Sequence, residues 1–147
     1  MNFAQSSPFI YYACLLAACG YAFFRGNRTE YLGAAIILAG SLATTIGLSV
    51  FETAWTGFGT STFYIDMIVL LALIHLTLVS DRFWPMWVTA FHLVAISVHV
   101  ATAVAPDLAP WALATGSAFW AYPMLLALAI GAHEYVRPAE AERLRSG

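Results

Sequence analysis

Residues 62–105 read TFYIDMIVLLALIHLTLVSDRFWPMWVTAFHLVAISVHVATAVA and contain two apolar runs separated by a short polar turn. The turn is Ser80-Asp81-Arg82. A helix needs roughly 20 apolar residues to cross a bilayer, and the runs at 62–80 and 83–105 are both about that long. Because the turn is so short, the two runs are predicted to form an antiparallel pair of membrane-spanning helices.

The rest of the chain has the same character. Of its 147 residues, 61% are hydrophobic and 10% are charged, whereas soluble domains average about 25% charged residues. So few charges could not cover a water-facing surface, and runs that are continuous rather than alternating exclude β-barrel strands. We therefore predict an all-α integral membrane protein with a single transmembrane domain over 1–147. Its five helices are predicted at 8–24, 31–50, 62–80, 83–105 and 111–135, followed by a polar tail at 137–147.

Every basic side chain is an arginine, and the arginines lie at alternate ends of the apolar runs. Basic residues are concentrated in cytoplasmic loops, so the arginine ends are predicted to be cytoplasmic, with the N-terminus outside and the C-terminus inside. The absence of lysine and the wealth of alanine suggest a GC-rich bacterium, and hence a multi-pass protein of a bacterial inner membrane. Tryptophan is enriched at membrane interfaces, and Trp84 and Trp87 are predicted to mark the inner one. The arginines are Arg25, Arg28, Arg82, Arg137, Arg143 and Arg145.

Three glycines recur at seven-residue spacing in the second predicted helix: Gly33, Gly40 and Gly47. Seven residues return almost to the same face of a helix, with a drift of about 20°. Small residues let helix backbones approach closely, which is how helices associate in lipid. Two alternatives stay open, because this face could pack against another helix of the same chain or dock a partner subunit.

Ionisable groups inside a bilayer are costly and are functional candidates. Asp66 and His99 are predicted to share an outer-leaflet depth, whereas His75 and His92 share an inner-leaflet depth. Helix periodicity places His92 and His99 on one face of the fourth helix. It places Asp66 and His75 on opposite faces of the third. The histidine face can therefore meet Asp66 or His75, but not both.

Two specific hypotheses follow from these residues. In the first, His75 and His92 are the axial ligands of a haem b in an electron-transfer subunit, or one of them pairs with His133. Haem b is the one cofactor that the sequence suggests. In the second, Asp66 and His99 relay protons or bind a cation, a role that suits histidine because it titrates near neutral pH.

Catalytic chemistry has little support in the sequence. A nucleophile needs a base within hydrogen-bond reach, and no such arrangement or His-Glu-x-x-His metal motif is present. We therefore predict no catalytic or metal-binding residues and no enzyme. The glycine face favours an accessory or structural subunit of a larger inner-membrane complex, or a homo-oligomer packed through helix faces. The predicted partners are the lipid bilayer and other membrane subunits or a second copy; nucleic acid is not expected, because the arginines form no basic face.

The runs SDRFWPMWVTAFHLVAISVH at 80–99 and WAYPMLLALAIG at 120–131 carry a resemblance. They are similar to uncharacterised small multi-pass membrane proteins of alphaproteobacterial type. The resemblance covers part of the chain and implies no activity, cofactor or site residue.

Overall fold

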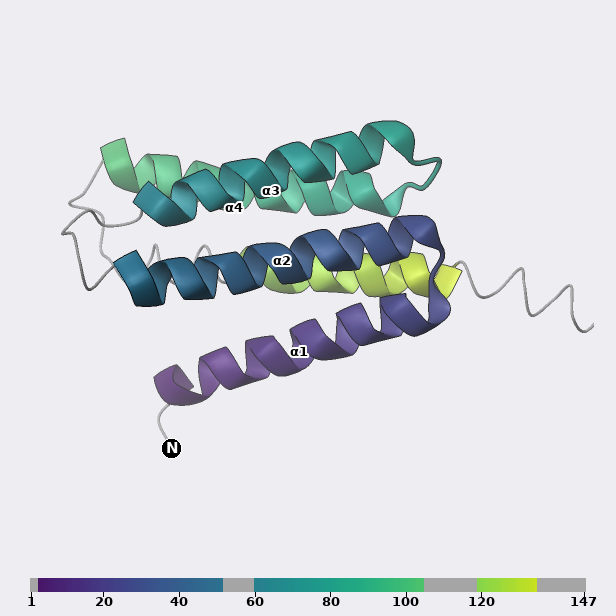
Figure 1. Cartoon of the computed structure of the whole chain (residues 1–147), viewed down its shortest axis with the longest axis horizontal. Coiled ribbons are helices and arrows are strands. Elements are labelled where there is room, and N and C mark those ends of the chain that lie inside the picture. Colours follow the sequence, from purple (N-terminus) through teal and green to yellow (C-terminus); the bar gives the residue numbers. More distant parts are fainter. Residues whose placement is uncertain (1–2, 52–59, 105–118, 135–147) are drawn as a thin grey trace, which may run out of the picture.

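Helices account for all the regular structure in the described part of the chain. The computed structural model describes residues 3–51, 60–104 and 119–134. The predictions for residues 111–118 and for the polar tail at 137–147 lie outside these ranges. The helices are α1 (Phe3–Arg25), α2 (Arg28–Phe51), α3 (Thr60–Val79), α4 (Trp84–Val104) and a further helical segment at residues 119–134, called helix 119–134 below (Figure 1).

The first helix begins earlier than the sequence predicted. We expected Pro8 in the first turn, but α1 starts at Phe3. Proline lacks a backbone N–H and therefore removes one helical hydrogen bond. Helices α2, α3 and α4 lie close to their predicted ranges, and both predicted ends of the fifth helix lie outside the described residues.

Three of the described helices are long and apolar enough to cross a membrane. Their qualifying segments are Arg28–Gly47, Thr62–Val79 and Trp84–Ala101, and the apolar part of α1, Phe9–Arg25, is shorter. Large apolar side chains such as Phe24, Leu78 and Val104 are exposed. Helices that are apolar on all sides are typical of membrane spans, so the composition and the surface both indicate a membrane protein.

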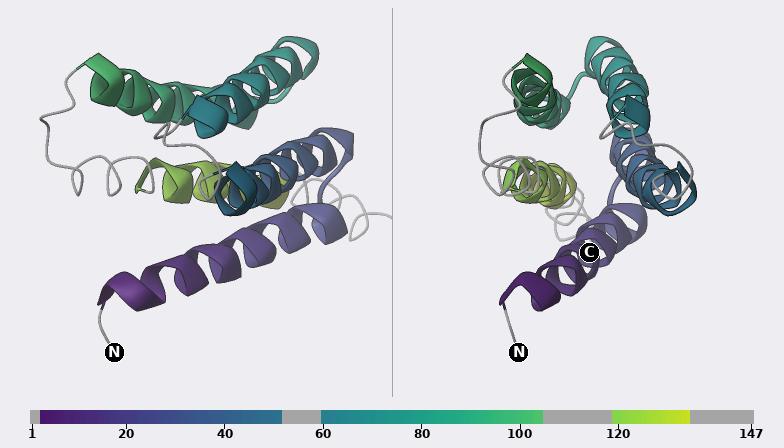
Figure 2. Two further views of the ribbon diagram at one scale, coloured as in Figure 1. Left: turned by 60° about the vertical axis from the view of Figure 1, so that its left-hand side comes forward. Right: turned by 90° about the vertical axis from the view of Figure 1, so that its left-hand side faces the viewer.

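The helices run up and down a bundle. Its two short turns, between α1 and α2 and between α3 and α4, lie at the same end. Figure 1 shows the α1–α2 turn, the α3–α4 turn and the end of helix 119–134 on the same side. Arg25, Arg28 and Arg82 therefore lie at this end, which we call the arginine end. In sequence order, α2 packs against α1 and α3, and α3 packs against α4. The end-on view places helix 119–134 between α4 and α1 (Figure 2).

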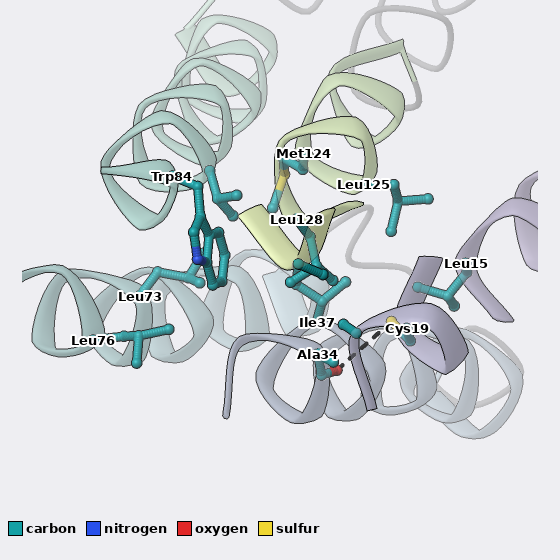
Figure 3. Packing of buried hydrophobic residues seen from close by; sticks show 13 residues of the cluster. Leu15, Cys19, Ala34, Ile37, Leu73, Leu76, Trp84, Met124, Leu125 and Leu128 are labelled. Atoms are coloured by element: carbon teal, nitrogen blue, oxygen red, sulfur yellow. Dashed lines mark hydrogen bonds between the residues drawn. The ribbon is translucent and has the colours of Figure 1, made fainter. Parts of the chain in front are cut away.

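One apolar core joins all of these helices. Leu73 of α3 and Leu128 of helix 119–134 are fully buried in it. In the same core, the Cys19 thiol donates a hydrogen bond to the carbonyl oxygen of Ala34 over 3.8 Å (Figure 3). Cys19 thus serves as a small core residue that brings α1 close to α2. The residues labelled in Figure 3 are Leu15, Cys19, Ala34, Ile37, Leu73, Leu76, Trp84, Met124, Leu125 and Leu128.

Trp84 belongs to this core, so its indole faces the inside of the bundle and not the lipid, although it lies at the helix end where the sequence predicted the interface. Its side chain is 5% exposed, whereas Trp87, three residues later, is 50% exposed. The indole lies between Gly33 of α2 and Gly131 of helix 119–134, and a Cβ atom at either glycine would overlap the ring. The two glycines thus form a slot that lets three helices meet around one tryptophan.

A fully buried carboxylate accepts the hydrogen bond from this tryptophan. Glu30 Oε1 lies 3.1 Å from Trp84 Nε1 and 3.8 Å from Arg82 Nε. Glu30 Oε2 accepts a 2.9 Å hydrogen bond from the backbone N–H of Asn27. A glutamate three positions after the N-cap residue can accept a hydrogen bond from the backbone N–H of that residue, which is one half of a capping box. Glu30 therefore caps α2 and ties its start to the α3–α4 turn.

The glycine face of α2 is covered by other helices of the same chain. A Cβ atom at Gly40 would lie 2.7 Å from Val69 Cγ2, and one at Gly47 would lie 3.2 Å from Ile65 Cδ1. Val69 and Ile65 both belong to α3. Of the two alternatives for this face, the contacts in the described residues match packing within the chain.

Candidate functional site: a histidine–aspartate pair between α3 and α4

A histidine–aspartate contact joins α3 and α4 towards the end of the bundle opposite the arginines. His99 Nε2 lies 3.2 Å from Asp66 Oδ2, and the two side chains are 26% and 17% exposed, respectively. The short α3–α4 turn sets the register of the two antiparallel helices, and this register brings the two residues to one level. The pair is therefore largely covered and still within reach of the surface.

A second histidine holds the backbone of the same aspartate. His92 Nε2 lies 3.0 Å from the carbonyl oxygen of Asp66, and His92 is 8% exposed. A carbonyl oxygen only accepts hydrogen bonds, so Nε2 of His92 carries the proton in this contact. Asp66 is thus held at two points, by His99 through its carboxylate and by His92 through its carbonyl.

Helix geometry explains how one residue serves two histidines. A side chain leans towards the N-terminus of its helix, whereas the carbonyl points towards the C-terminus. The Asp66 carboxylate therefore leans towards His99, and its carbonyl points towards His92. The two histidines are seven residues apart, or about 10 Å along α4, and Asp66 lies between them. The histidine face of α4 thus meets Asp66 and not His75.

His75 lies elsewhere. It is exposed, two residues after the fully buried Leu73, and so on the opposite side of α3. Two axial haem ligands must point at one iron, but here His92 Nε2 is directed at the Asp66 carbonyl. His75 and His92, as they lie in the structure, do not point at a common position. The haem hypothesis stays a prediction that the visible spectrum of the purified protein tests.

Asp66 lies well past the start of its own helix. Because α3 begins at Thr60, Asp66 lies about 9 Å further along. The effect of the helix dipole falls off within the first turn, whereas His99 Nε2 is in direct contact with the Asp66 carboxyl group.

Apolar side chains separate this site from the arginine end. Leu73 and Val88 are fully buried between the two. Nearer the arginine end, the hydroxyl groups of Thr77 and Thr89 lie 3.0 Å apart and link α3 to α4.

Sequence reasoning missed Glu30 and the second role of Asp66. The spacing from Asn27 to Glu30 is the signal that would have found the capping box. The contact of His92 with the Asp66 carbonyl could not be predicted, because every residue has a backbone carbonyl and the sequence does not show which one a histidine will reach. Within the described ranges, no three His, Cys, Asp or Glu residues gather as a metal-binding group. Comparison of the chain with protein-family models, with curated proteins and with solved structures finds no match.

Proposed function

We propose that this protein handles protons in a membrane, and that Asp66 and His99 form the site at which a proton is bound and released. The observation that carries the proposal is the 3.2 Å contact between His99 Nε2 and Asp66 Oδ2 in a pair of apolar helices. A proton moves readily between two groups at hydrogen-bond distance. Histidine is the side chain best suited to exchange one near neutral pH.

The energetics of buried ion pairs support a role beyond stability. An ionisable side chain inside a spanning helix is unfavourable, by about 2.5–3.5 kcal/mol at the helix centre on insertion scales, and Asp66 lies between the centre and the start of α3. Replacing a buried ion pair with apolar residues of similar size is often neutral or stabilising. A histidine–aspartate pair is therefore a poor way to hold two apolar helices together and a good way to hold an exchangeable proton.

Asp66→Asn is expected to abolish proton movement. The amide keeps the size of the carboxylate but can no longer take up a proton, so proton flux into liposomes that contain the purified protein should fall to the level of protein-free liposomes. His99→Gln should have the same effect. His75→Gln is the matched control, because His75 lies on the exposed side of α3. The proton flux of this variant should equal that of the wild type. A pH-sensitive dye inside the liposomes reports the flux.

Two results would contradict the proposal. One is a wild-type flux no higher than that of protein-free liposomes, and the other is an unchanged flux in Asp66→Asn. Circular dichroism and gel filtration show whether each variant keeps its helices and its size.

We also propose that five helices cross the bilayer of a bacterial inner membrane, with the N-terminus outside and the C-terminus in the cytoplasm. The gathering of Arg25, Arg28 and Arg82 at one end of the bundle supports this orientation, because basic residues favour the cytoplasmic side. In this orientation Asp66 and His99 lie in the outer leaflet and exchange protons with the periplasmic side.

A second candidate function is that of a subunit of a larger membrane assembly or of a homo-oligomer. One contact favours it: the hydroxyl groups of Tyr12 and Thr45 lie 2.6 Å apart on the exposed face between α1 and α2. Polar side chains contribute to contacts between membrane helices, and a partner helix would cover this pair better than lipid. In mild detergent, a native mass above that of one chain is expected; a monodisperse monomer without a partner would contradict this candidate.

A further inference from the structure

An apolar groove of about 350 Å³ runs between α4 and helix 119–134 at the arginine end. Phe83, Trp87 and Phe91 line one wall, and Pro123 and Ile130 line the other. A single carboxylate, that of Glu134, lies among the lining residues. The volume falls within the range of about 300–1,000 Å³ that is usual for small-molecule sites.

The groove is as long as one leaflet of a bilayer. From Pro123 to Glu134 the helix rises about 16 Å, and the hydrocarbon core of a bilayer is about 30 Å thick. Just beyond Pro123, Trp120 stacks on Phe91 with ring centroids 6.1 Å apart and an interplanar angle of 21°. This stack joins the two walls and closes the groove near mid-membrane. A spanning helix from a partner would need a groove about twice as long.

The charge at the mouth distinguishes one kind of lipid from another. Glu134 is exposed at the last described turn of the helix, at the level where lipid headgroups lie. A carboxylate there attracts a cationic headgroup and repels an anionic one, and it can accept a hydrogen bond from a primary ammonium but not from a quaternary one. Trp87, which is half exposed, adds an aromatic face that attracts ammonium groups.

We propose that this groove binds one phospholipid of the leaflet at the arginine end. An acyl chain lies along the aromatic wall, and a primary-ammonium headgroup lies beside Glu134. This inference does not depend on the proton site, because the groove shares no residue with Asp66, His92 or His99.

Native mass spectrometry of the delipidated full-length protein tests the inference. The probes are phosphatidylethanolamine, phosphatidylcholine and phosphatidylglycerol with identical acyl chains. The wild type should retain one phosphatidylethanolamine in preference to the other two lipids. Glu134→Gln should reduce that preference about two- to fivefold, the ratio expected when one exposed ion pair is lost.

A second variant tests the groove itself. Ala127 also lines the groove, and Ala127→Trp should fill it and abolish retention of all three lipids. Leu71→Trp, on the exposed face of α3, is the control and should bind lipid as the wild type does. Equal retention of the three lipids by the wild type would refute the headgroup assignment. Unchanged retention in Ala127→Trp, or a dimer in place of bound lipid, would refute the groove as a lipid site.

Discussion

Replacing Trp84 with alanine is expected to lower the free energy of unfolding by about 3–5 kcal/mol, the usual range for truncating a large buried aromatic residue. The indole fills the slot between Gly33 and Gly131, so its loss leaves a cavity where α2, α4 and helix 119–134 meet. It also removes the hydrogen bond that Trp84 Nε1 donates to the fully buried Glu30. A buried acceptor without its donor adds to the loss.

Trp87→Ala is the matched control for this prediction. Trp87 lies on the same helix and is 50% exposed, and its ring contacts within the described residues are with Phe83 and Phe91, so its truncation should lower stability clearly less than that of Trp84. Unfolding of both variants in mixed micelles, followed by circular dichroism, gives the two free energies. A similar loss in both variants would contradict the central position of Trp84.

Gly131→Ala is expected to destabilise the bundle although alanine is the better helix former. The added methyl group would overlap the Trp84 ring, and overpacking a core typically lowers stability by about 1–3 kcal/mol. The gain from replacing a helical glycine is about 0.5–1 kcal/mol, so the clash outweighs it. The same unfolding assay measures the net change.

Gly20→Ala, on α1, is expected to stabilise the protein. A Cβ atom at Gly20 would have no neighbour within 4 Å, so the gain in helix stability of about 0.5–1 kcal/mol should appear undiminished. The two alanine substitutions should therefore shift stability in opposite directions, and a stabilised Gly131→Ala protein would rule out the slot. Without the Trp84 ring, the methyl group of Gly131→Ala has nothing to clash with. The free energy of unfolding of the Trp84→Ala/Gly131→Ala double variant should therefore fall by less than the sum of the losses in the two single variants.

The course of the chain was largely predictable because membrane helices follow simple rules of length and charge. The apolar runs predicted the helix ranges, and the alternating arginines predicted that Arg25, Arg28 and Arg82 would share one end. Depth was predictable too, since each residue adds about 1.5 Å along a helix. On that basis Asp66 and His99 were expected at one depth, and the structure has them in contact.

The packing at the arginine end of the bundle was not predictable in the same way. Hydropathy could not distinguish Trp84 from Trp87, because both lie at a helix end and both suit an interface. Which of them turns inward depends on Gly131 and Gly33, which are far from Trp84 in sequence. Glu30 was overlooked because it lies beside the arginine turn, where a carboxylate is expected to meet water rather than an indole.

The pairing of Asp66 with His99 inside a bilayer is the central claim, and solid-state NMR tests it most directly. In protein labelled with ¹⁵N-histidine and ¹³C-aspartate and reconstituted in lipid, the account predicts a through-space correlation between His99 Nε2 and the Asp66 carboxyl carbon. His75 should show no such correlation with Asp66. A spectrum from the intact bundle that lacks the His99–Asp66 correlation would contradict the account.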